Sequence, residues 1–134
     1  ERIRFRNLLV ELSRERVVIF STHIIEDISS SCNQVAVLNK GKLIYLGKPI
    51  DMTREAEGHV WQLTIPADQF SSFVESHLVV HHMSDADSVR VRVISESSPA
   101  ESAVRATPSL EDAYLWLLRG QGNHNNSKTY YAAG

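Results

Sequence analysis

Two short apolar runs constrain the fold of this chain more than any other feature of its sequence. Residues 17–20 and residues 35–38 each place four apolar side chains in succession, without the alternation of a strand that has one wet face. Such runs are typical of parallel strands, which are covered on both faces. Between them, Ile24, Ile25 and Ile28 recur with helical spacing and predict a short helix. This half is therefore predicted to be an α/β unit with one crossover helix.

The segments around these runs carry signals of their own. Leucines and a phenylalanine with helical spacing predict an amphipathic helix over residues 1–14. The Asn-Lys-Gly-Lys sequence at residues 39–42 predicts a tight turn into a second strand at residues 43–46, so that the two strands form a hairpin. Pro49 is suited to the first turn of another short helix.

The pattern changes after Gly58, which is the predicted domain boundary. Residues 60–65 alternate between apolar and polar side chains, as a half-buried strand does. A helix over residues 66–77 and two strands at residues 79–83 and 89–93 are predicted to follow. The second unit is thus expected to begin as β-α-β-β.

Three details of this second unit can be tested against a structure. Strict alternation predicts that Arg90 and Arg92 both face solvent. Residues 100–106 are predicted to form a helical turn. Ser109 is predicted to cap a last helix, in which Asp112 would complete a capping box.

That last helix is predicted to end at Gly120, a residue type common just past helix ends. Residues 121–134 are polar and are predicted to be a flexible tail. The fold class is therefore predicted as an α/β unit over residues 1–58, followed over residues 59–120 by a small α+β open-faced sandwich of β-α-β-β-α order.

Composition excludes several classes of function. The 134 residues carry a net charge of −2, so no overall attraction to nucleic acid is expected. The single cysteine, Cys32, excludes an internal disulfide. None of the six glycines lies in the first forty residues, so a glycine-rich phosphate loop is excluded there.

His23 is the residue best suited to a chemical role. It follows the apolar run at residues 17–20, and ligands of open α/β sheets bind beyond the carboxyl ends of the strands. A neutral imidazole there could donate a hydrogen bond to a phosphate oxygen. By position alone, a surface or capping histidine is the more ordinary interpretation.

Residues 1–47 resemble the last third of the nucleotide-binding domain of an ABC transporter. The resemblance rests on the buried run at residues 17–20, then Ser21-Thr22-His23, an acidic helix, and the Gln-Val-Ala-Val-Leu-Asn-Lys-Gly-Lys-Leu sequence of residues 34–43. The resemblance implies the end of a RecA-like ATPase core. It also implies that His23 is the switch histidine, both catalytic and in contact with the γ-phosphate.

The same resemblance implies a longer protein that uses ATP and Mg, a second ATP-binding subunit and membrane permease subunits. Such a protein would lie on the cytoplasmic face of the membrane, held there by the permease. Walker A, Walker B and the signature motif are missing from this sequence. The chain is therefore expected to be a C-terminal fragment that neither binds ATP nor hydrolyses it alone.

The end of the second unit resembles the C-terminal extension of some bacterial exporter ATPases. Its Pro-Ser-Leu-Glu-Asp-Ala-Tyr-Leu-Trp-Leu-Leu sequence at residues 108–118 carries the resemblance, which implies a regulatory or subunit-contact role. In the family this role is poorly defined.

Other interpretations of the sequence remain open. The chain could be a non-catalytic interaction or small-ligand regulatory module of β-α-β-β-α order, in which His23 would be incidental. No metal site is expected, since the neighbouring His81 and His82 would point to opposite faces of a strand. Apolar strands without neighbours also predict a homodimer or a domain swap.

Overall fold

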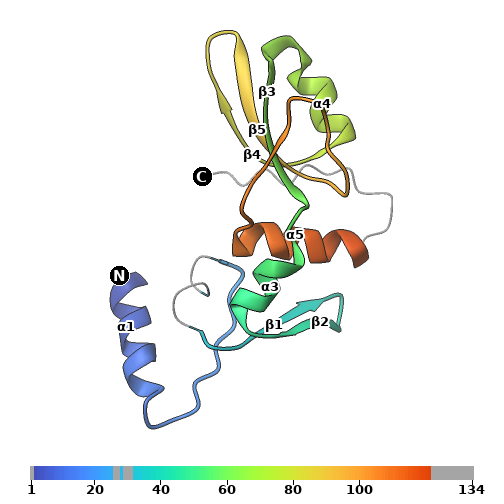
Figure 1. The fold of residues 1–134 in the computed structure, drawn as a ribbon. Helices are drawn as coiled ribbons and strands as arrows, with labels where there is room; N and C mark the ends of the chain where they lie inside the picture. The colour runs from blue at the N-terminus through green and yellow to red at the C-terminus, as the bar shows by residue number, and fades with distance from the viewer. Residues whose placement is uncertain (1, 26–27, 29–31, 122–134) are drawn as a thin grey trace.

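The computed structural model describes residues 2–25, 28 and 32–121. These residues form a mixed α/β fold with two antiparallel sheets and four α-helices (Figure 1). In chain order the elements are α1 (Arg2–Leu12), β1 (Val35–Asn39), β2 (Lys42–Gly47), α3 (Pro49–Glu55), β3 (Val60–Pro66), a 3-10 turn η1 (Ala67–Gln69), α4 (Phe70–Ser76), β4 (Leu78–Ser84), β5 (Ser88–Ile94), β6 (Val104–Arg105) and α5 (Leu110–Gln121).

The predicted hairpin is confirmed as β1 and β2. Lys40 and Gly41 connect the strands with φ angles of 51° and 76°. Two successive left-handed residues match the right-handed twist of the flanking strands. However, β1 buries Val35 and Val37 and exposes Leu38, so its apolar run is not covered on both faces as predicted.

The strand predicted at residues 17–20 is wrong. These residues have no regular structure, and Val17 and Ile19 are 90% and 91% exposed. A strand needs a hydrogen-bonded neighbour, and the β1–β2 sheet contains no third strand among the described residues. The predicted parallel crossover is therefore absent from this part of the chain.

The helix predicted after this run falls partly on residues 26–27 and 29–31, which lie outside the described residues. Two backbone hydrogen bonds join described residues of this region. Ile28 N donates to Ile25 O at 3.0 Å, and Cys32 N donates to Ile28 O at 3.3 Å. The tail was predicted over residues 121–134, but Gln121 is the last residue of α5, one residue beyond the predicted helix end at Gly120. Residues 122–134 lie outside the described part.

The second sheet has the strand order β4-β5-β3-β6, and α4 covers one of its faces (Figure 1). Phe70, Phe73 and Val74 pack against a core that contains Leu63 and Val91. The alternation predicted for residues 60–65 is confirmed, because the strand buries alternate side chains. This burial removes apolar surface from water and stabilises the packing of α4 on the sheet.

The helical turn predicted over residues 100–106 is only partly correct. Ala103 N donates to Ala100 O at 3.1 Å, which closes a turn. The next residues form β6 instead, in which Val104 pairs with Gln62 of β3. The free edge of β3 therefore gains a short partner strand, which satisfies backbone groups that a helical turn would have left without a ladder.

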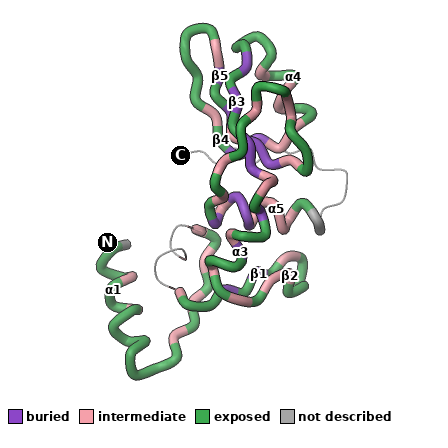
Figure 2. The backbone as a smooth tube through the Cα atoms, in the orientation of Figure 1, coloured by how far each residue is buried: buried purple, intermediate pink, exposed green. Residues whose placement is uncertain are grey.

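Helix α5 lies between the two sheets and packs against α3 (Figure 1). Its residues Leu110 and Ala113 join Val35, Met52 and Val60 in one buried cluster. In Figure 2 buried backbone runs through α5 and the four-stranded sheet, whereas α1 is almost entirely exposed. The predicted boundary at Gly58 stays a prediction.

A buried ion pair ties the start of α5 to β5. The Arg92 Nε and Nη2 groups donate to the Asp112 carboxylate, with Nη2 to Oδ2 at 2.6 Å, and Asp112 is fully buried. Nη2 also donates to Thr107 O at 2.8 Å. Arg92 therefore does not face solvent as predicted, whereas Arg90 does.

The predicted capping box is confirmed at the same place. Asp112 N donates to Ser109 Oγ at 3.1 Å, and Ser109 N donates to Asp112 Oδ2 at 2.7 Å. These bonds satisfy two backbone donors of the helix start. The Asp112 carboxylate thus serves both as a cap and as the buried partner of Arg92.

We expect Asp112→Ala to lower the free energy of unfolding by about 3 kcal/mol, because it leaves Arg92 without its buried partner. The matched control is Asp51→Ala, which breaks the exposed Arg54–Asp51 pair at 3.2 Å and should cost less than about 1 kcal/mol. Urea unfolding measures both values. Equal losses in the two variants would contradict the assigned importance of the buried pair.

Candidate functional site

His23 lies in a short irregular segment, residues 21–23, that follows the exposed apolar run. Ile24 N donates to Thr22 Oγ1 at 3.0 Å, which closes a local turn with the histidine at its centre. Thr22 is half-buried, whereas Ser21 and His23 are exposed. The structure thus places the predicted site residue on the surface.

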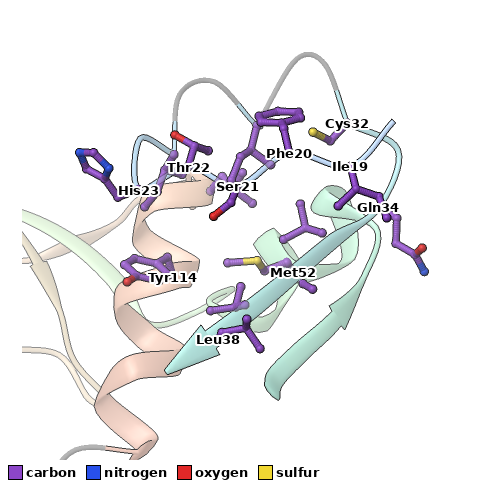
Figure 3. Close-up of a pocket in the computed structure, with 16 residues that line it drawn as sticks. Ile19, Phe20, Ser21, Thr22, His23, Cys32, Gln34, Leu38, Met52 and Tyr114 are labelled. Carbon is purple, nitrogen blue, oxygen red and sulfur yellow. The ribbon is translucent and has the colours of Figure 1, made fainter. Parts of the chain in front are cut away.

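A cavity of about 470 Å³ lies behind this segment. Its other walls come from β1, α3 and α5, through side chains that include Val37, Met52, Leu110 and Tyr114. Residues 21–23 form one border of the cavity (Figure 3). The walls are mostly apolar, so the cavity is suited to an apolar occupant more than to a phosphate.

Figure 3 shows the His23 ring on the outer side of the segment, directed away from Met52 in the cavity. An exposed imidazole has access to water and to ligands that approach from outside. A neutral imidazole in this position can donate one hydrogen bond and accept another. These contacts do not test a role of His23 with ATP, which stays a prediction.

The remaining histidines do not build a metal site in the described part of the chain, where no three His, Cys, Asp or Glu side chains cluster. Sequence analysis missed the stacking of His59 on Trp116, with ring centroids 3.9 Å apart and planes 10° apart. The Arg119 guanidinium lies 5.3 Å from the centre of the Trp116 ring. No pattern in the sequence marks this stack, because its members lie far apart along the chain.

One tyrosine beside α3 has a shifted pKa. Burial of the Tyr45 hydroxyl, together with the nearby charges of Asp51 and Glu55, raises the pKa of Tyr45 above its ordinary value of 10.0. The hydroxyl donates to Lys48 O at 2.8 Å, which requires its proton. Tyr45 is therefore a neutral structural donor at the end of the hairpin.

Comparison with known proteins finds several ABC transporter ATP-binding proteins. The chain is 27% identical over 126 residues to the probable multidrug ABC transporter ATP-binding protein YbhF of Escherichia coli strain K12, covering 84% of this chain and 22% of that protein. It is 47% identical over 51 residues to the energy-coupling factor transporter ATP-binding protein EcfA of Methanothermobacter thermautotrophicus, covering 37% of this chain and 16% of that protein. It is 25% identical over 59 residues to the uncharacterized ABC transporter ATP-binding protein YxlF of Bacillus subtilis, covering 44% of this chain and 20% of that protein.

The chain spans about a fifth of the length of the curated relatives it matches. No family model matches it, and no solved structure matches it. Its homologues are thus ABC transporter ATP-binding proteins, at low identity and partial coverage. In the part of the chain that the structure describes, no helix is both long enough and apolar enough to cross a membrane.

We expect Met52→Ala to lower the free energy of unfolding by about 2–5 kcal/mol, because it removes a side chain that is 2% exposed from the wall of the cavity. Met83→Ala is the control, since Met83 is 61% exposed, and it should change stability by less than about 0.5 kcal/mol. Chemical unfolding of both variants checks the difference. A Met52→Ala variant as stable as the Met83→Ala variant would show that the cavity wall collapses without cost.

Proposed function

We propose that this chain is the C-terminal part of the ATP-binding subunit of an exporter-type ABC transporter. In the longer protein, ATP hydrolysis would drive transport through separate membrane permeases. A second ATP-binding subunit would complete the site, and the assembly would lie on the cytoplasmic face of the membrane. The homologues support the ATP-binding family, and the order of motifs around His23 supports the placement within it.

The observation that carries this proposal is the unequal exposure of large apolar side chains. Among the described residues, thirteen large hydrophobic side chains are exposed, and eleven of them lie between Ile3 and Ile50. Only Met83 and Val104 lie in the second half. The gathering of exposed apolar side chains in one half of the chain supports an interface there. We take it as the surface that packs against the remainder of the ATPase core.

His23 is proposed to act as the switch histidine. Its exposed imidazole would donate a hydrogen bond to the γ-phosphate of ATP that is held by the rest of the subunit. A hydrogen bond to a charged group contributes about 1.5–3 kcal/mol. If this bond strengthens in the transition state, it accounts for about one to two decades in rate.

The described residues do not supply a complete site for ATP and Mg. Beside the cavity they offer the exposed imidazole of His23, and within the described ranges they contain no cluster of metal ligands. In the proposed protein, other parts of the subunit would hold the nucleotide and the metal. ATP bound there would supply the phosphoryl group, while this chain would contribute the histidine.

The predicted division at Gly58 belongs to this proposal. Residues 59–120 would form the accessory unit, with a regulatory or subunit-contact role. The apolar cavity is the observation that would instead favour a small-ligand regulatory module. Saturable binding of an apolar ligand, together with normal turnover of a His23 variant, would support that alternative.

We expect His23→Ala in the full-length ATPase to lower turnover about 10–100-fold while leaving ATP binding nearly unchanged, because only the transition-state hydrogen bond is lost. His81→Ala is the matched control, since His81 is an exposed histidine of β4. Steady-state phosphate release and equilibrium nucleotide binding measure the two effects. Turnover of His23→Ala equal to that of the control would overturn the role.

We expect the chain on its own to form dimers at high concentration, because its exposed apolar side chains are not covered by the remainder of the proposed core. The variant Val17→Thr/Ile19→Thr should shift the equilibrium toward monomer. The variant Met83→Thr/Val104→Thr, which changes two exposed side chains of the second half, should not. Light scattering coupled to gel filtration distinguishes these outcomes, and a wild-type chain that stays monomeric contradicts the prediction.

A further inference from the structure

Helix α5 and the His23 segment share one cavity although they are far apart in the sequence. Leu110 and Tyr114 form part of the cavity wall, and residues 21–23 form another part. In Figure 3 the segment passes the first turn of α5, and Tyr114 lies about one turn further along the helix. The accessory end of the chain therefore reaches the candidate site directly.

The His23 segment lies at the surface and belongs to no helix or strand. Ile24 N donates a local hydrogen bond to Thr22 Oγ1, and both Ser21 and His23 are exposed. The apolar residues that follow it, Ile25 and Ile28, pack against the buried cluster that contains Leu110 and Ala113. The position of His23 thus depends on a surface to which α5 contributes.

Helix α5 is in turn clamped at the end nearest to His23. The Asp112 carboxylate accepts hydrogen bonds from Arg92 of β5 and from Ser109 N, while Arg92 Nη2 reaches Thr107 O. A buried, bidentate pair of this kind fixes orientation as well as distance. The four-stranded sheet therefore determines where the first turn of α5 lies.

We propose that α5 positions the His23 segment through the cavity wall to which Tyr114 contributes, and that the Arg92–Asp112 pair is the clamp that links this position to the four-stranded sheet. The positioning is a property of this chain. Only its consequence for ATP hydrolysis rests on the proposed function. It gives the accessory unit a specific task, which is to hold the switch histidine in place.

The test is amide hydrogen exchange by NMR on this chain, followed at Ile24, Ile28 and Cys32, together with the imidazole signal of His23. We expect Tyr114→Ala to speed exchange at these amides by about tenfold or more, because a supported segment opens more often when its support is removed. The His23 signal should move toward the position of a free imidazole. Tyr114→Phe, which keeps the ring, should stay within about twofold of the wild type.

Leu115→Ala is the matched control, because Leu115 lies on the same helix and does not line the cavity. It should leave both readouts unchanged. If Tyr114→Ala leaves exchange at the three amides and the His23 signal as in the wild type, the proposal is wrong. If Tyr114→Ala does not fold, Asp112→Asn decides: faster exchange than in Asp51→Asn supports the clamp, and equal exchange overturns it.

The outcome is separate from the fate of the proposed ATPase role. Normal turnover of His23→Ala in the full-length protein would remove the catalytic role and leave the exchange result intact. Conversely, exchange in Tyr114→Ala equal to that of the wild type would remove the positioning role while the loss of turnover in His23→Ala stood.

Discussion

The position of α5 relative to the four-stranded sheet depends on the contacts of the Asp112 carboxylate. This carboxylate is fully buried, and its oxygens accept hydrogen bonds from Arg92 and from Ser109 N. A buried charge is costly without such partners. Because these partners belong to β5 and to the start of α5, the interaction joins the four-stranded sheet to the helix that packs on α3. The two sheets are thereby linked through α5 and α3.

The two halves of the molecule differ in how far their apolar side chains are exposed to water. The second half buries its apolar side chains between α4 and the sheet, and the first half leaves Phe5, Val17 and Ile19 in solvent. Helix α1 forms as predicted, yet its apolar side chains Phe5, Leu8 and Leu12 are not covered by the described chain. An amphipathic helix gains most of its stability from the packing of such side chains. These exposed side chains and the longer homologues fit the same proposal.

Local signals in the sequence predicted local structure well. The Lys40–Gly41 turn, the alternation of β3 and the Ser109–Asp112 capping box depend on neighbours within a few residues, and all are confirmed. Alternation put Arg92 on the same face of β5 as Arg90, but the prediction that Arg92 faces solvent was wrong. It could not show that Asp112, twenty residues later, lies against that face. A period in the sequence predicts the face on which a side chain lies, but not the residue that it contacts.

The failures share a physical cause. Residues 17–20 have the composition of a buried strand, but a strand exists only where a neighbour supplies hydrogen bonds. The wall that α5 adds to the cavity beside His23 depends on tertiary packing across most of the chain. Both features depend on residues far apart in the sequence, which a periodic pattern in a short segment does not report. His23 could be identified as a candidate from the sequence, whereas the residues that line the cavity beside it could not.

The place of α5 also governs the order in which the chain can complete its core during synthesis. Val35 and Leu110 share one buried cluster although 75 positions separate them. The first hairpin leaves a ribosome long before the helix that covers it, and contacts of such long range form slowly. Until α5 arrives, β1 and α3 present apolar surface to the cell, and a chaperone or a neighbouring chain can occupy it first.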